Sequence, residues 1–132
     1  MSGLALLLAG APAALADHEP YYRYTVLGFV KGARGAPAAR QTVELIRDKT
    51  GLSHLAETDE RGFFVIVLRA GDELLGESLT LKAGGATARV TVAFEAGNQT
   101  DERGTRVDVE GGRVVERAAW FRSTLVNFLG SR

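Results

Sequence analysis

Apolar and polar residues alternate along most of this chain, in short segments separated by turn-forming residues. Alternation with a period of two is typical of β-strands that bury one face, and the 16 glycines can supply turns between them. No long helical stretch separates the segments, which argues against the crossovers of a parallel α/β sheet. The pattern predicts an all-β antiparallel sandwich of about seven strands. The alternating segments are residues 22–31, 41–47, 53–58, 63–69, 78–82, 88–95, 106–110 and 113–116.

Some of these segments carry a more specific signal. Residues 63–69 are apolar on both faces, which is typical of a central strand that is covered on both sides. The two-glycine turns at Gly84-Gly85 and Gly111-Gly112 predict β-hairpins between the segments that flank them. The expected sandwich is therefore built largely from neighbouring strands joined by tight turns.

The first half of the series resembles a known family. The motifs are Val26-Leu27-Gly28-Phe29-Val30, Gly35-Ala36-Pro37, Val43-Glu44-Leu45 and Thr58-Asp59-Glu60-Arg61-Gly62-Phe63. In this order they resemble the carboxypeptidase regulatory-like domain, which implies a transthyretin-like (prealbumin-like) sandwich. Asp59 can cap its turn through the carboxylate, and Gly62 can adopt a positive φ that Phe63 could not. The resemblance covers about residues 24–68; after Leu68 the tyrosine that the family usually shows is missing.

Charge and cysteine content narrow the classes of partner and site. Lys plus Arg and Asp plus Glu are both 16, so a neutral chain has no overall field to attract nucleic acid. The chain has no cysteine, which excludes disulfides, thiolate metal sites and thiol nucleophiles. An apolar core alone must hold the domain together.

The first sixteen residues have the pattern of a signal peptide. A short apolar run, Leu4 to Ala9, precedes Ala14-Leu15-Ala16, which suits cleavage before Asp17. No Lys or Arg precedes the run, unlike most signal peptides, and an apolar first element of the fold is the alternative. We expect a signal peptide at 1–16, a sandwich at 17–117, a periplasmic or secreted location, and no integral membrane segment in the mature chain.

Enzymes on related sandwiches use residue sets that this chain lacks. Hydroxyisourate hydrolases of the transthyretin-like type end in Y-R-G-S, whereas residues 129–132 read Leu-Gly-Ser-Arg. Intradiol dioxygenases bind iron through two tyrosines and two histidines, but the two histidines here are His18, beside the predicted cleavage site, and His54. The sequence predicts no catalytic residue, no metal ligand and no cofactor.

The period changes to that of a helix near the C-terminus. Within 118–132 an aromatic and aliphatic stripe recurs at helical spacing, and Gly130 is a suitable stop. Three alternatives follow: the amphipathic helix packs on its own sandwich, docks into a partner, or lies on a membrane surface. The candidate partner-binding residues are Trp120, Phe121, Leu125 and Phe128.

Together these patterns predict an immunoglobulin-like or transthyretin-like sandwich with a short C-terminal helix. The expected function is that of an exported, non-catalytic accessory or structural domain that binds a larger protein assembly. One alternative is a carbohydrate or cell-surface binding module, for which Tyr21, Tyr22, Tyr24 and Phe29 are the available aromatics. A small hydrolase-like enzyme is a further alternative.

Overall fold

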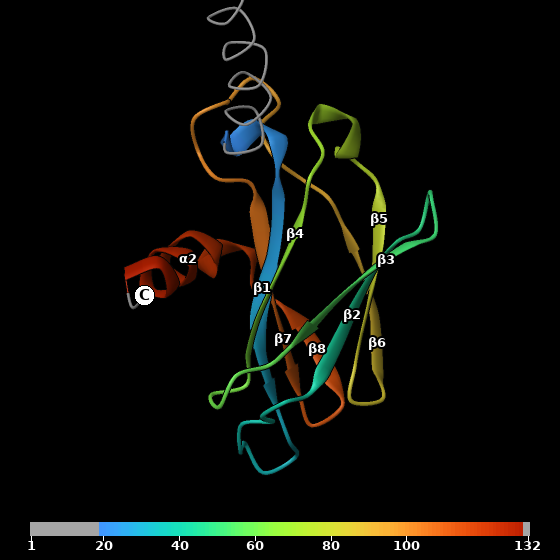
Figure 1. Cartoon of the computed structure of the whole chain (residues 1–132), viewed down its shortest axis with the longest axis vertical. Coiled ribbons are helices and arrows are strands. Elements are labelled where there is room, and N and C mark those ends of the chain that lie inside the picture. The colour runs from blue at the N-terminus through green and yellow to red at the C-terminus, as the bar shows by residue number, and fades with distance from the viewer. Residues whose placement is uncertain (1–18, 131–132) are drawn as a thin grey trace, which may run out of the picture.

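The computed structural model describes residues 19–130, which form two four-stranded sheets and a C-terminal helix (Figure 1). The first sheet has the order β4-β1-β7-β8, and the second has the order β3-β2-β5-β6. The strands of the first sheet are β1 (Tyr24–Lys31), β4 (Phe63–Leu68), β7 (Gly104–Glu110) and β8 (Arg113–Glu116). Those of the second are β2 (Thr42–Arg47), β3 (Leu52–Glu57), β5 (Ser78–Ala83) and β6 (Ala86–Thr91).

This architecture confirms the all-β sandwich with a short C-terminal helix, with eight strands instead of about seven. Both two-glycine turns join antiparallel neighbours, β5 to β6 and β7 to β8, as predicted. The predicted signal peptide, Met1 to Ala16, and His18 lie outside the described residues. Within residues 19–130, no helix combines the length and apolar character needed to cross a membrane.

Four short helices complete the fold within residues 19–130. Three are single 3₁₀ turns: η1 (Pro20–Tyr22), η2 (Asp72–Leu74) and η3 (Ala118–Trp120). η3 leads directly into α2 (Phe121–Gly130), the predicted C-terminal helix. Figure 1 shows α2 beside the first sheet, on the side away from β5 and β6.

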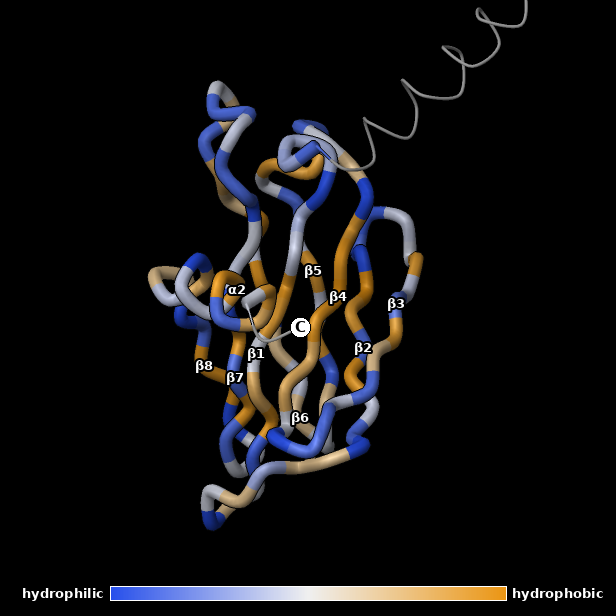
Figure 2. The backbone as a smooth tube through the Cα atoms, turned by 60° about the vertical axis from the view of Figure 1, so that its left-hand side comes forward, coloured by the Kyte–Doolittle hydropathy of each residue, from blue (hydrophilic) through white to orange (hydrophobic). Residues whose placement is uncertain are grey.

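Alternation along the strands places the main core between the two sheets. Tyr24, Val26 and Val30 of β1 face the interior, where they meet Leu45 of β2 and Leu81 of β5. Figure 2 shows the resulting hydrophobic stretches along the central strands. Burial of each such large side chain is worth roughly 1.5–3 kcal/mol, so the core can hold the fold without disulfides.

Two features of the first sheet differ from the prediction. Residues 63–69 were expected to be a central strand, but β4 is an edge strand. Its outer face is apolar because α2 lies over it, so the pattern indicates cover on both faces and not a central position. The second difference is that β1 and β7 are parallel, because the chain changes sheets between them.

The turn before β4, at Thr58 to Phe63, has the cap at Asp59 and the positive φ at Gly62 that the sequence predicts. The Asp59 carboxylate accepts hydrogen bonds from the backbone N–H groups of Arg61 (2.8 Å) and Phe63 (3.0 Å). Gly62 has φ of 81°, and a Cβ there would lie 2.4 Å from the carbonyl oxygen of Val30. The buried Thr58 hydroxyl donates to the Ala38 carbonyl and accepts from an amide. Glycine at position 62 is thus required both by conformation and by space.

β1 and β7 approach each other closely at Gly28. Their pairing runs through Leu27 and Arg106, is interrupted, and resumes at Val30 and Val109. A Cβ at Gly28 would lie 1.7 Å from the carbonyl oxygen of the facing strand. At the interruption, the backbone N–H of Phe29 donates to the Asp108 carboxylate at 3.0 Å. A side chain therefore completes the ladder where the main chains do not pair.

Candidate functional site

The four predicted partner-binding residues do not share one surface. Phe121 and Leu125 are buried against the outer face of the first sheet, in a cluster with Leu27 and Phe63. Phe128 is half-buried and packs on the Phe63 ring, with centroids 5.2 Å apart. The helix thus packs on its own sandwich, the first of the three alternatives.

Trp120 is the exception, since 51% of its surface is exposed. The guanidinium groups of Arg106 and Arg117 lie 5.2 and 5.3 Å from its ring centroid. Such stacking is worth about 0.5–1 kcal/mol at an exposed site. Trp120 is therefore fixed in place by two cations, although it is half open to solvent.

Beneath Trp120 lies a charged cluster that the sequence did not reveal. The Asp108 carboxylate, 1% exposed, accepts hydrogen bonds from Arg106 and Arg117. Arg106 also donates to the Thr124 hydroxyl of α2 at 3.1 Å. Hydrogen bonds to Glu110 and to Asp108 raise the pKa of Arg117, and the Arg117 hydrogen bond lowers the pKa of Glu110. The cluster fastens η3 and α2 onto β7.

This cluster lies on a face of β7 that alternation alone predicts to be exposed to solvent. Arg106, Asp108 and Glu110 occupy every second position of β7, on the face opposite to the core residue Val107. A row of alternating charges usually marks a solvated face. The signal that could have located it is the apolar stripe of the C-terminal helix, because an amphipathic helix that folds back needs a sheet face to cover.

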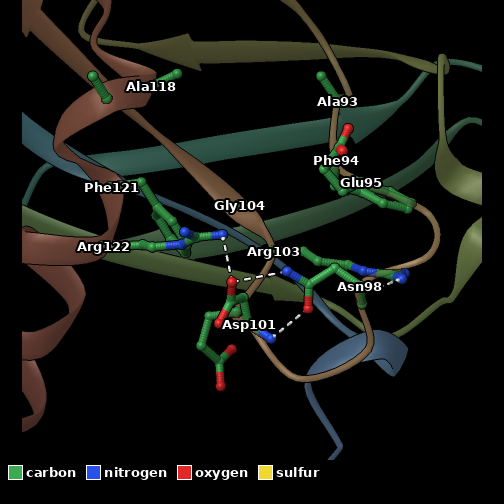
Figure 3. A pocket seen from close by; sticks show the side chains of 12 residues that line it. Ala93, Phe94, Glu95, Asn98, Asp101, Arg103, Gly104, Ala118, Phe121 and Arg122 are labelled. Atoms are coloured by element: carbon green, nitrogen blue, oxygen red, sulfur yellow. Dashed lines mark hydrogen bonds and ion pairs between the residues drawn. The ribbon is translucent and has the colours of Figure 1, made fainter.

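A pocket of about 300 Å³ lies between residues 93–104 and the start of α2 (Figure 3). Asp101 pairs with Arg122 at 3.5 Å and accepts from the Asn98 amide at 2.8 Å. The buried Arg103 lies over the Phe94 ring at 4.0 Å. Arg103 also donates to Asp72 (2.9 Å) and to main-chain carbonyls, while its Nε has no hydrogen-bond partner among the described residues. Most polar groups here bind one another, and these interactions mainly hold the 93–104 loop in place.

A second hollow, of about 270 Å³, lies between α2 and the first sheet. Its lining is largely aliphatic and aromatic, and the Arg23–Glu102 ion pair also borders it. We call it the α2 groove. It is lined by Arg23, Thr25, Val65, Val67, Glu102, Leu125, Phe128 and Leu129. Leu129, 53% exposed, is the most open of its large apolar residues.

The other candidate residues are dispersed. Tyr24 is in the main core and Phe29 is packed against Phe63, while Tyr22 is exposed, so the aromatics form no shared binding face. His54 is on β3, where its Nδ1 is buried and has no hydrogen-bond partner in the part of the chain that the structure describes. Among residues 19–130, no group of three His, Cys, Asp or Glu is placed to hold a metal ion.

Comparison with known proteins places the chain in no family. No protein-family model and no curated protein matches it. Among solved structures it is similar to the crystal structure of (S)-allantoin synthase, at 12% sequence identity and a TM-score of 0.49. That similarity covers 75% of this chain and 44% of the other, so the chain spans less than half of that protein's length. A similarity this low is no guide to what the chain binds or does.

Proposed function

We propose that this chain is an exported, non-catalytic accessory domain that binds a protein partner through the α2 groove. The observation that carries the proposal is the groove itself. α2 covers the outer face of the first sheet only in part and leaves Val65 and Val67 of the edge strand β4 lining an apolar hollow. An apolar hollow beside a sheet edge is a surface on which a partner can bury side chains.

The size of the groove favours a protein side chain over a small ligand. Small-molecule sites usually enclose about 300–1,000 Å³, and the α2 groove of about 270 Å³ falls just below that range. Its polar border is an ion pair whose two groups already neutralise each other, so little is left to recognise a charged ligand. The occupant we propose is an extended segment of the partner with apolar residues at alternate positions, because a strand beside β4 would project every second side chain to one face.

Two further parts of the proposal rest on the sequence. The A-x-A pattern at Ala14 to Ala16 supports export to the periplasm or beyond. The geometry of the Asp59 and Gly62 turn is compatible with a carboxypeptidase regulatory-like domain in the first half. The carbohydrate-binding alternative has weaker support, because packing within the fold occupies Tyr24 and Phe29.

A phage-displayed library of random linear peptides, selected on the immobilised protein, tests the groove. We expect enrichment of peptides with alternating apolar residues. The Leu129→Glu variant should weaken binding of these peptides about tenfold or more, as for a central interface contact. Val126→Glu is the matched control, because Val126 is 67% exposed on the same helix but does not line the groove. Failure to enrich such peptides, or equal loss of binding in both variants, would count against the proposal.

A further inference from the structure

The β3 edge of the second sheet has exposed apolar side chains and few features that prevent pairing with another strand. β3 is the outermost strand of that sheet, and its Leu52 and Leu55 are 60% and 68% exposed. The strand has six residues without Lys, Arg or Pro, and it pairs with β2 without a bulge. Its one charge is Glu57, at the end. Edges of this kind associate with other strands unless something blocks them.

The edges on the opposite side of the sandwich are protected. β6 carries Arg89 within the strand, and β8 has only four residues, of which Arg113 and Glu116 are charged. Charges and short length are the devices by which natural sheets avoid edge-to-edge pairing. β3 has six residues and no charge before its last one, so the outer strands on the two sides of the sandwich differ in this protection.

We infer that β3 pairs with β3 of a second copy of this chain, in an antiparallel ladder about a two-fold axis. Ser53, Leu55 and Glu57 lie on the face away from the core, because their β2 partners alternate with the buried Val43 and Leu45. An antiparallel edge is self-complementary, since each copy offers the same alternating donors and acceptors.

The side chains select the register of this ladder. With the axis at Leu55, the two Leu55 side chains face each other and exclude water from the most exposed apolar group of the strand. Ser53 of one copy then faces Glu57 of the other, so a small polar residue and not a like charge lies opposite each Glu57 carboxylate. With the axis at His54, each Leu55 would instead face Ser53 of the other copy, and the two most exposed apolar side chains would not bury each other.

Sedimentation velocity of the full chain over a range of concentrations tests the association. A single strand pair is a small interface, so we expect a dimer with a dissociation constant of about micromolar or weaker. Leu55→Lys should raise that constant about tenfold or more, because both copies carry the unfavourable charge. Val126→Lys, an equally exposed substitution on α2, should leave it unchanged.

Disulfide trapping tests the register, since the chain has no cysteine of its own. Leu55→Cys should cross-link to itself on mild oxidation, because facing Cβ atoms lie about 4.5–5.5 Å apart. Ser53→Cys alone should not, because the two copies of residue 53 would be about 14 Å apart, but a mixture with Glu57→Cys should. A chain that stays monomeric up to about 1 mM, or a dimer that Val126→Lys but not Leu55→Lys dissociates, would overturn the inference. Either result leaves the α2 groove untouched, because the groove lies on the other sheet.

Discussion

Substitution of Asp108 by alanine tests how the C-terminal helix is held on the sandwich. The Asp108 carboxylate is buried and accepts from the Phe29 backbone and from the guanidinium groups of Arg106 and Arg117. Removal of one partner from a buried ion pair costs about 3–5 kcal/mol, and an unpaired buried N–H alone costs about 1–3 kcal/mol. The side chains of Arg106 and Arg117 stay 19% and 26% exposed, so water can solvate part of the freed charge.

We therefore expect Asp108→Ala to lower the free energy of unfolding by about 3 kcal/mol, near the lower bound for a buried pair. For a domain of this size 1 kcal/mol corresponds to about 4 °C in Tm, so Tm should fall by about 12 °C. Urea and thermal unfolding measured by circular dichroism give both values. The free energy of unfolding of Asp108→Asn should lie between those of the wild type and Asp108→Ala, because asparagine keeps an acceptor for the Phe29 amide but loses the charge.

Asp101→Ala is the matched control. Asp101 also pairs with an arginine, Arg122, but both side chains are more than half exposed and lie 3.5 Å apart. Exposed pairs of this kind contribute about 0–1 kcal/mol. If Asp108→Ala were no more destabilising than Asp101→Ala, the ion cluster would not be what fixes α2, and the reasoning would be refuted.

Three further predictions concern the core. Gly28→Ala should destabilise the fold by more than about 3 kcal/mol in urea unfolding, because the added Cβ would lie 1.7 Å from a backbone carbonyl oxygen. Gly97→Ala is the control and should leave the stability unchanged, because no atom lies within 4 Å of its Cβ position. Equal effects of the two substitutions would contradict the close approach of β1 and β7. Burial raises the pKa of Tyr24 to about 12, so the folded protein holds this proton more tightly than the unfolded chain. The resulting stability is complete below about pH 10 and is lost as pH rises toward 12, which urea unfolding at several pH values should detect in the wild type but not in Tyr24→Phe. Phe121→Ala should cost about 3–5 kcal/mol in thermal unfolding, whereas an unchanged Tm would mean that the helix does not pack on its own sheet.

The strands themselves could be read closely from the sequence. Alternation gave residues 41–47 and 63–69, and the structure has β2 at Thr42–Arg47 and β4 at Phe63–Leu68. The turns were equally predictable, because residue type determines the positive φ at Gly62 and the carboxylate cap at Asp59. Turn and strand patterns of this kind determine the structure of residues only a few positions away.

The arrangement of strands could not be read in the same way. Residues 63–69 are apolar on both faces, and this pattern does not depend on whether a sheet or a helix covers the second face. The edge position of β4 therefore could not be predicted from it. The role of Asp108 depends on residues far away along the chain, Phe29 and Arg117, and on a helix that converts an outer face into a buried one. The α2 groove arises from the same covering and has no motif of its own.

The parallel pairing of β1 with β7 also bears on when the chain can fold. The second sheet uses only residues 42–91. Two of its pairs, β2 with β3 and β5 with β6, join consecutive strands, and the third, β2 with β5, joins residues at most 40 positions apart. The first sheet needs β1 to meet β7, and Phe29 and Asp108 are 79 residues apart. Loop closure over such a separation slows folding, so the second sheet should form early and the first only after nearly the whole chain is available. During synthesis β1 can pair with β4 early, but one of its edges stays open until β7 has been made.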